Sequence, residues 1–316
     1  MIRLCLVIPC YNEEEVLPET SKRLKQKYDQ LQDKKIISKN SRIIFVDDGS
    51  KDKTWELIEA LHEQNGIFWG VKLSRNRGHQ NALLAGLSAA MDKADAVISM
   101  DADLQDDIDA IDRFIEKYNA GAEVVYGVRS ARKKDTFFKK NTAIAFYRIM
   151  SKLGADIVYN HADYRLLSNR ALHGLFEFKE VNLFLRGIVP LIGYKSDVVY
   201  YERAERFAGE SKYPLKKMLA FAFEGITSLS IKPIRMIITI GVAMLFVSLA
   251  MVVYFIVRHL IGYTVTGWTS LIVSIWVIGA LQLISIGVIG EYVGKVYLET
   301  KERPRFIIET FINDEE

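Results

Sequence analysis

The sequence is poor in cysteine and has almost no net charge. Its 316 residues include two cysteines, Cys5 and Cys10, and the formal net charge is +3. Two cysteines at this spacing indicate neither a disulfide framework nor a zinc site. A charge this small gives no reason to expect nucleic acid as the main partner. The chain also lacks internal repeats and low-complexity linkers.

Glycine-rich phosphate loops are absent as well. Neither G-x-G-x-x-G nor G-x-x-x-x-G-K follows the first apolar run, which argues against a dehydrogenase and against a P-loop enzyme. That run, residues 4–8, is too short for the apolar region of a signal peptide. We therefore interpret it as a buried strand.

Short apolar runs alternate with amphipathic segments in the first part of the chain. The predicted strands are residues 4–8, 43–46, 68–73, 96–100 and 123–126, and the predicted helices are residues 13–31, 53–63, 79–91 and 108–118. This alternation predicts an α/β fold with a mostly parallel sheet and helices on both faces. Ligands in such folds bind beyond the carboxyl ends of the strands. A further short strand is expected at residues 305–310.

Apolar residues dominate the second part. Residues 137–153 are both basic and apolar, and residues 214–230 carry apolar side chains at helical spacing beside Lys216 and Lys217. This second pattern predicts an amphipathic helix in a membrane interface. An ordinary helix packed on the core is the alternative.

Two stretches, residues 236–257 and 268–290, carry no charge at all. Each has the length needed to cross the hydrocarbon core, and the short connection between them predicts a helical hairpin. Lysine and arginine gather before the first stretch and after the second, so the positive-inside rule places both termini in the cytoplasm. A buried hairpin of a soluble protein is the alternative.

Acidic residues follow the first two predicted strands. Glu13 comes after the first strand, and Asp47 and Asp48 end the second. Carboxylates at neighbouring strand ends can accept hydrogen bonds from ribose hydroxyls or a base N–H. A turn followed by a helix cap explains Asp47 and Asp48 equally well when they are considered alone.

Two aspartates follow the fourth predicted strand. Asp101 and Asp103 are two residues apart, and in an extended segment such residues point the same way. Two hard oxygen ligands suit Mg²⁺ or Mn²⁺, with a nucleotide diphosphate completing the shell. Such a metal would stabilise a departing diphosphate as a Lewis acid.

Together these motifs resemble a known family. The segments Pro9–Glu13, Val46–Ser50 and Asp101–Gln105 are similar to those of the GT-A glycosyltransferases of family 2. More narrowly, they resemble the polyprenyl-phosphate glycosyltransferases, which include dolichol-phosphate mannose synthase and the bactoprenol glucosyltransferases. Residues 74–78, 163–167 and 206–213 support the resemblance, which extends over nearly the whole chain.

The resemblance implies roles for individual residues. It implies that Asp163 acts near the sugar, with Asp103 and Arg129 also catalytic. The metal would be held by Asp101, Asp103 and Gln105. The nucleotide-sugar site would comprise Pro9, Tyr11, Glu13, Val46, Asp47, Asp48, Asp101, Ala102, Asp103, Gln105, Arg129, Arg206 and Lys212. An acceptor phosphate or anionic lipid headgroups would approach Arg132, Lys139 and Lys140.

Three polar residues near these motifs have open roles. An acceptor phosphate is already an oxyanion near neutral pH, so we expect Asp163 to position groups more than to remove a proton. His161, two residues earlier, is interpreted as local packing. His79 and Gln80 open the third predicted helix, where a nucleotide contact and a helix start are equally compatible with the sequence.

The expected organisation is a cytosolic GT-A domain over residues 1–213, an interfacial helix over 214–230, a transmembrane hairpin over 231–294 and a cytosolic tail over 295–316. The implied reaction is inverting transfer of glucose or N-acetylglucosamine from a UDP-sugar to undecaprenyl phosphate at the cytoplasmic membrane. Relatives suggest a homo-oligomer. A processive polysaccharide synthase and a non-catalytic membrane scaffold are the alternatives. A synthase would carry a Gln-x-x-Arg-Trp motif, which this sequence lacks.

Overall fold

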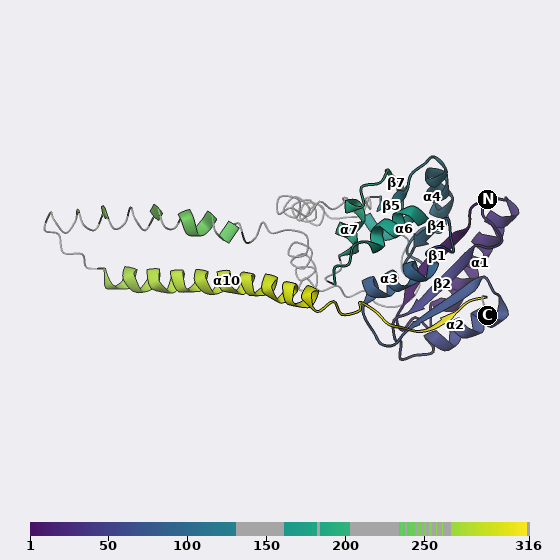
Figure 1. Cartoon of the computed structure of the whole chain (residues 1–316), viewed down its shortest axis with the longest axis horizontal. Helices are drawn as coiled ribbons and strands as arrows, with labels where there is room; N and C mark the ends of the chain where they lie inside the picture. The colour runs from purple at the N-terminus through teal and green to yellow at the C-terminus, as the bar shows by residue number, and fades with distance from the viewer. Residues whose placement is uncertain are drawn as a thin grey trace. The chain divides into compact units, whose positions relative to one another are not determined.

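The chain forms an α/β unit built on one eight-stranded sheet (Figure 1). The structure is a computed structural model that describes residues 1–130, 161–181, 184–202 and 267–314, with scattered positions between 234 and 261. The sheet and its helices belong to one compact unit, and the long helix near the C-terminus belongs to another. The two units are treated separately.

The strands are β1 Leu4–Cys10, β2 Arg42–Asp47, β3 Phe68–Leu73, β4 Ala96–Ser99, β5 Val124–Arg129, β6 His161–Ser168, β7 Ser196–Tyr201 and β8 Ile308–Ile312. The helices of this unit are α1 Leu17–Asp33, α2 Thr54–Gln64, α3 His79–Ala90, α4 Ala110–Asn119, α6 Asn169–Phe176 and α7 Leu185–Leu191. The strand order is β7-β5-β6-β4-β1-β2-β3-β8.

The centre of the sheet is parallel. Strand β1 pairs in parallel with β2 and β4, and β2 pairs in parallel with β3. Strand β6 is antiparallel to both β4 and β5, and β8 is antiparallel to β3 at the sheet edge. Because β6 runs against β4, its first residues lie at the edge where the parallel strands end. The start of β6, which is remote in sequence from β1, β2 and β4, therefore lies at the edge of the sheet where a ligand is expected to bind.

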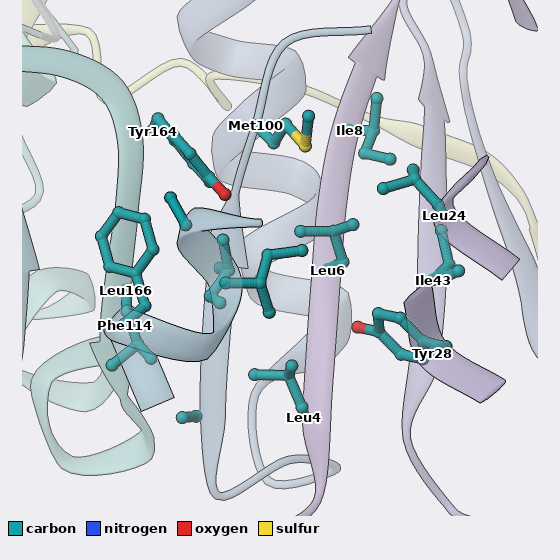
Figure 2. Close-up of a cluster of buried hydrophobic side chains, with 14 of the residues drawn as sticks. Leu4, Leu6, Ile8, Leu24, Tyr28, Ile43, Met100, Phe114, Tyr164 and Leu166 are labelled. Atoms are coloured by element: carbon teal, nitrogen blue, oxygen red, sulfur yellow. The ribbon is translucent and has the colours of Figure 1, made fainter. Parts of the chain in front are cut away.

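Strand β1 is buried on both faces, which explains why it is uniformly apolar. Leu4, Leu6 and Ile8 point into one cluster, which α1 and α4 cover (Figure 2). Cys5 and Val7 point to the opposite face, into a second cluster built with α3, α6 and α7. Both cysteines are buried thiols.

Every predicted strand and helix of the first 126 residues is present, with shifted ends. The first helix begins at Leu17 instead of residue 13, because Asn12 adopts a positive φ of 53° and the next residues form a turn. The predicted strand at 305–310 is found at Ile308–Ile312. Strands β6 and β7 and helices α6 and α7 were not predicted from periodicity.

The second unit contains α10, Trp268–Thr300, which includes the predicted span 268–290 and continues ten residues beyond it. Within the described part of the chain one segment, Val277–Thr300, is long and apolar enough to cross a membrane, with a mean hydropathy of 1.6. Only scattered positions of the other predicted span, 236–257, are described. The predicted interfacial helix and the basic segment 137–153 lie outside the described residues.

Candidate functional site

The predicted acidic residues gather at the carboxyl edge of β1, β2 and β4. Strand β4 ends at Ser99, and residues 102 and 103 form a turn in which Leu104 has a φ of 56°. From the sequence, we expect the segment that carries Asp101 and Asp103 to be extended. This expectation is wrong, because the chain turns at residues 102 and 103. Asp103 is buried, and its Oδ1 accepts a hydrogen bond from the Gln105 amide at 3.2 Å. The turn fixes the Asp103 carboxylate against its own backbone.

Asp101 lies next to the imidazole of His79, which also approaches Asp163. The Nε2 atom of His79 is 3.6 Å from Asp101 Oδ1 and 3.8 Å from Asp163 Oδ2. Burial raises the pKa of Asp101; His79 opposes this shift, and the carboxylates of Asp163 and Asp103 add to it. The side chain keeps 32% of its surface exposed, so water moderates the effect. The charges of Asp163 and Asp103 therefore act on Asp101, although no three His, Cys, Asp or Glu side chains of the residues that the structure describes form a group that could hold a metal ion.

Asp163, near the start of β6, is held by two arginines. Arg165 Nη2 donates to Asp163 Oδ1 at 2.5 Å, and Arg186 of α7 donates to both oxygens, from Nη2 at 3.0 Å and from Nε at 3.3 Å. Burial alone would raise the pKa of Asp163, but Arg186 and Arg165 outweigh it and hold the pKa well below its usual range. A carboxylate held in this way is a poor proton acceptor at neutral pH.

A second buried carboxylate connects Arg129 to β7. The Tyr201 hydroxyl donates to Asp106 Oδ1 at 2.6 Å, and Arg129 Nε donates to the Tyr201 oxygen at 3.3 Å. Burial raises the pKa of Asp106 to about 6, and the charge of Asp101 adds to this rise. Asp106 Oδ2 is buried and has no hydrogen-bond partner among the described atoms. The hydroxyl thus bridges Arg129, a predicted nucleotide-sugar residue, to the loop that carries Asp101.

At the end of β2, the carboxylates of Asp47 and Asp48 accept hydrogen bonds from backbone amides. Asp48 accepts hydrogen bonds from the amides of Arg77 at 2.7 Å and Gly78 at 2.9 Å. Asp47 accepts from the Ser50 amide at 3.2 Å. Burial raises the pKa of both aspartates, and these amides oppose the rise. Asp48 thereby anchors the loop that leads into α3, a role the sequence analysis did not predict.

Gly49 explains how closely that loop packs. Its φ is 68°, and a Cβ atom on it would lie 2.6 Å from the Asn76 amide nitrogen and 2.8 Å from the Arg75 carbonyl carbon. Any larger residue would therefore displace the loop. At the start of α3, Gln80 Oε1 accepts from the Leu185 amide at 2.9 Å. Gln80 consequently ties α3 to α7.

The structure brings most predicted site residues to one edge of the sheet. Tyr11 is exposed and Glu13 is partly buried, both just beyond β1, whereas Pro9, Val46 and Ala102 are buried. Arg206, Lys212, Arg132, Lys139 and Lys140 lie outside the described residues. His161 begins β6, and its side chain is not described. The predicted role of each of these residues remains a prediction.

Four charged or polar residues at this edge were not predicted as site residues. They are Asp106, Arg165, Arg186 and Tyr201. Asp106 directly follows the predicted metal ligands, so its position was a usable signal. Arg186 and Tyr201 have no local signal, because their partners lie 23 and 95 residues away in sequence.

The fold and this acidic edge define a class of enzyme. The sequence model described as "Glycosyl transferase family 2" matches residues 5–176. The chain therefore belongs to glycosyltransferase family 2, and it is a transferase with the GT-A α/β fold.

Curated relatives match along nearly the whole chain. The uncharacterized glycosyltransferase YkoT of Bacillus subtilis (strain 168) is 53% identical over 99% of this chain and 93% of its own length. A prophage bactoprenol glucosyl transferase homolog of Escherichia coli (strain K12) is 40% identical over 97% and 98% of the two chains. The bactoprenol glucosyl transferase of Shigella phage SfX is also 40% identical, over 98% and 99%.

Proposed function

We propose that this glycosyltransferase transfers a hexose, glucose or N-acetylglucosamine, from a UDP-sugar to a polyprenyl phosphate such as undecaprenyl phosphate. The observation that carries the proposal is the group formed by Asp101, His79 and Asp163 at the carboxyl edge of the sheet. It places two carboxylates and an imidazole at the edge of the sheet where we expect the donor to bind. Relatives named bactoprenol glucosyl transferase, similar to this chain over 97% of its length or more, support the acceptor class.

The donor would bind across the loops after β1, β2 and β4. Tyr11, Glu13 and the Asp47–Asp48 pair would face the nucleoside, and Arg129 would bind the diphosphate together with Arg206 and Lys212. Tyr201 and Asp106 hold Arg129 in a defined orientation. A guanidinium presents its donors in a fixed plane that matches phosphate oxygens. Fixing that plane before binding reduces the conformational entropy lost when the donor binds.

The acidic group fits Mg²⁺ or Mn²⁺. Asp101, Asp103 and Gln105 supply hard oxygen ligands, and mutual repulsion among Asp101, Asp103 and Asp163 would be relieved by a divalent cation. Among the described residues, no three His, Cys, Asp or Glu side chains form a complete metal cluster, so diphosphate oxygens would complete the shell. Such an ion would act as a Lewis acid on the departing UDP.

The proposed reaction inverts the anomeric centre. An oxygen of the acceptor phosphate attacks the anomeric carbon from the face opposite UDP, so a C–O bond to the lipid phosphate forms as the C–O bond to UDP breaks. The attacking oxygen carries no proton at neutral pH, and the low pKa of Asp163 agrees with a positioning role. Catalysis would depend chiefly on orientation and on stabilising the charge of the leaving group.

A lipid-linked acceptor would explain why the chain carries long apolar segments that could anchor it in a membrane. Helix α10 would span the cytoplasmic membrane, residues 236–257 would form a second span, and residues 214–230 would lie in the interface. The catalytic domain, residues 1–213, and the tail, residues 295–316, would both be cytoplasmic. Anchoring confines the enzyme to the surface where the lipid phosphate is found and so raises its effective concentration.

A donor panel tests this proposal. Membranes containing the enzyme would be incubated with undecaprenyl phosphate, Mn²⁺ and individually UDP-glucose, UDP-N-acetylglucosamine and GDP-mannose, and lipid products would be identified by mass. We expect a lipid monophosphate carrying one hexose from a UDP donor. A soluble polymer, or donor consumption without a lipid-linked sugar, would contradict the proposal.

A further inference from the structure

His79, the first residue of α3, lies between two carboxylates of the candidate site without a hydrogen bond to either. Its Nε2 atom is 3.6 Å from Asp101 Oδ1 and 3.8 Å from Asp163 Oδ2, and both distances exceed the length of an N–H···O hydrogen bond. In the part of the chain that the structure describes, no group forms a hydrogen bond with the imidazole, and 44% of the side chain is exposed. The imidazole is therefore accessible to a ligand at this edge of the sheet.

Both neighbouring carboxylates have other partners in the proposed complex. Asp163 accepts hydrogen bonds from Arg165 at Oδ1 and from Arg186 at both oxygens, so it does not depend on His79. Asp101 is a predicted metal ligand, and a divalent cation would replace the imidazole as its counter-charge. An N–H at Nε2 would then find its acceptor in the donor substrate.

The backbone on both sides of His79 is fixed by contacts with distant residues. The two preceding amides donate to Asp48 at 2.7 and 2.9 Å, and the following residue, Gln80, accepts from the Leu185 amide at 2.9 Å. A side chain on a backbone that is fixed before binding loses less conformational entropy when a ligand binds. No side chain caps α3, so His79 does not serve as a cap for its own helix. The structure therefore favours a ligand contact over a helix-start role.

The positions of Asp101 and Asp163 determine which part of the donor would face His79. In the proposed complex the diphosphate lies beside Asp101 and the hexose lies near Asp163. The β-phosphate, with its bond to the anomeric carbon, connects these two parts of the donor. A phosphate close to two carboxylates is repelled by them, and an N–H donor between them reduces this repulsion. The partial positive charge at the start of α3 acts in the same sense.

We propose that His79 binds the β-phosphate of the UDP-sugar through Nε2 and stabilises the charge that this phosphate gains as UDP departs. The inference rests on the proposed function, because it assumes a UDP-sugar whose diphosphate lies beside Asp101. The bond between the anomeric carbon and the β-phosphate oxygen breaks, and its electron pair passes to that oxygen. The proton stays on Nε2, so His79 acts as a hydrogen-bond donor and not as a general acid.

Binding of UDP and of UMP to His79→Ala and His79→Gln tests the proposal, because UMP lacks the β-phosphate. Both nucleotides would be titrated into the detergent-solubilised full-length enzyme with Mn²⁺. We expect the dissociation constant of UDP to rise about ten- to hundredfold in His79→Ala, the range for a hydrogen bond to a charged group. That of UMP should stay within about twofold, less than the loss of one neutral hydrogen bond. The amide nitrogen of glutamine can donate in place of Nε2, so His79→Gln should give an intermediate value.

His173→Ala is the matched control. His173 of α6 is exposed, and its Nε2 atom is 2.8 Å from a carboxylate oxygen of Asp92, which lies just beyond the other end of α3. Its dissociation constants for UDP and UMP should equal those of the wild type. Urea denaturation should show that His79→Ala is about as stable as the wild type, because its imidazole is half-exposed and forms no hydrogen bond with a described residue.

The combination of results separates this inference from the proposed function. Unchanged UDP binding in His79→Ala would overturn the inference alone, and a raised KM for the UDP-sugar would then assign His79 to the hexose. Equal weakening of UDP and UMP binding would show that the substitution displaces the loop before α3, and would overturn it as well. A wild type that binds UDP but makes no lipid-linked sugar would refute the proposed acceptor, and the comparison of UDP with UMP would still decide the contribution of His79. A wild type that binds no UDP would refute the proposed donor and this inference with it.

Discussion

The two halves of the candidate site hold their carboxylates in different ways. In the proposed nucleoside half, Asp47 and Asp48 accept hydrogen bonds from backbone amides. In the proposed transfer half, Asp163 is held by Arg165, its neighbour in β6, and by Arg186 of α7, and Asp106 is held by Tyr201, which is remote in sequence. Amide partners are neutral and covalently part of a loop, so they fix a shape. Charged partners set a local potential.

This difference indicates what each half contributes. The shape of a loop whose amides bind a carboxylate changes little with pH or salt above the pKa of that carboxylate. Such a loop suits recognition of an uncharged nucleoside, which is its proposed role. A group of opposed charges responds strongly when a charged ligand enters. Substitutions in the transfer half should therefore change rates and pH dependence, and those in the nucleoside half should change local stability.

Asp101→Asn should have the largest effect. The substitution preserves shape but removes one negative charge, and we expect kcat to fall about 10²- to 10³-fold, as for loss of a single group that stabilises a leaving group. Stability should be unchanged or slightly increased, because burial and neighbouring carboxylates already disfavour the ionised form. The rate of lipid-linked sugar formation and urea denaturation measure the two quantities. Asp29→Asn, on the exposed face of α1, is the control. A kcat near the wild-type value in Asp101→Asn would contradict the proposed difference between the two halves of the site.

Asp163→Asn should lower stability as well as activity. It leaves two guanidiniums, one of them buried, without their carboxylate, and we expect the free energy of unfolding to fall by about 3 kcal/mol at pH 7. The folded-state pKa of Asp163 lies below its unfolded value of about 4. Its stabilising contribution is therefore complete above pH 4 and is lost as the pH falls toward the folded-state pKa.

Urea denaturation at several pH values measures this dependence. The difference in stability between the wild type and Asp163→Asn should be constant from pH 7 to about pH 5 and should narrow below about pH 4. A difference that persists unchanged at acidic pH would show that the arginine pairs do not stabilise the fold.

Asp48→Ala should act mainly on the loop before α3. It leaves the amides of Arg77 and Gly78 without their acceptor, and we expect a loss of about 2 kcal/mol. Hydrogen exchange at these two amides should accelerate, while exchange in β5 and β7 should not change. Asp48→Asn keeps one acceptor oxygen and should lose about half as much. Unchanged exchange at Arg77 and Gly78 would show that the carboxylate does not anchor the loop.

The parallel centre of the sheet was predictable because burial on both faces gives each strand an uninterrupted apolar run. Strand β6 was not, because Asp163 and Arg165 interrupt its apolar pattern and neutralise each other only after folding. Helix α7 has seven residues and contains Pro190, so neither its length nor its composition indicates a helix.

The residues of the candidate site likewise divide into those that the sequence predicts and those that it does not. Asp101, Asp103 and Asp48 were recognisable because they follow apolar strands within a few residues. Arg186 and Tyr201 were not, since a hydrogen bond between residues far apart in sequence leaves no periodic trace. Asp48 also shows that the position of a residue at a strand end does not determine its role. Its two oxygens bind the amides of Arg77 and Gly78, and no sequence pattern indicated this contact.

Tyr201→Phe should have the smallest effect and tests whether the two halves are separable. It removes the hydroxyl between Asp106 and Arg129, and we expect a loss of about 1 kcal/mol in stability. Arg129 would lose one orienting partner, so the KM for the UDP-sugar should rise a few-fold, while exchange at the Arg77 and Gly78 amides should stay unchanged. Tyr200→Phe is the matched control, because the neighbouring Tyr200 side chain is exposed. If Tyr201→Phe accelerated exchange in the loop that Asp48 anchors, the two halves would be coupled, and the division between a shape-fixing half and a charge-setting half would fail.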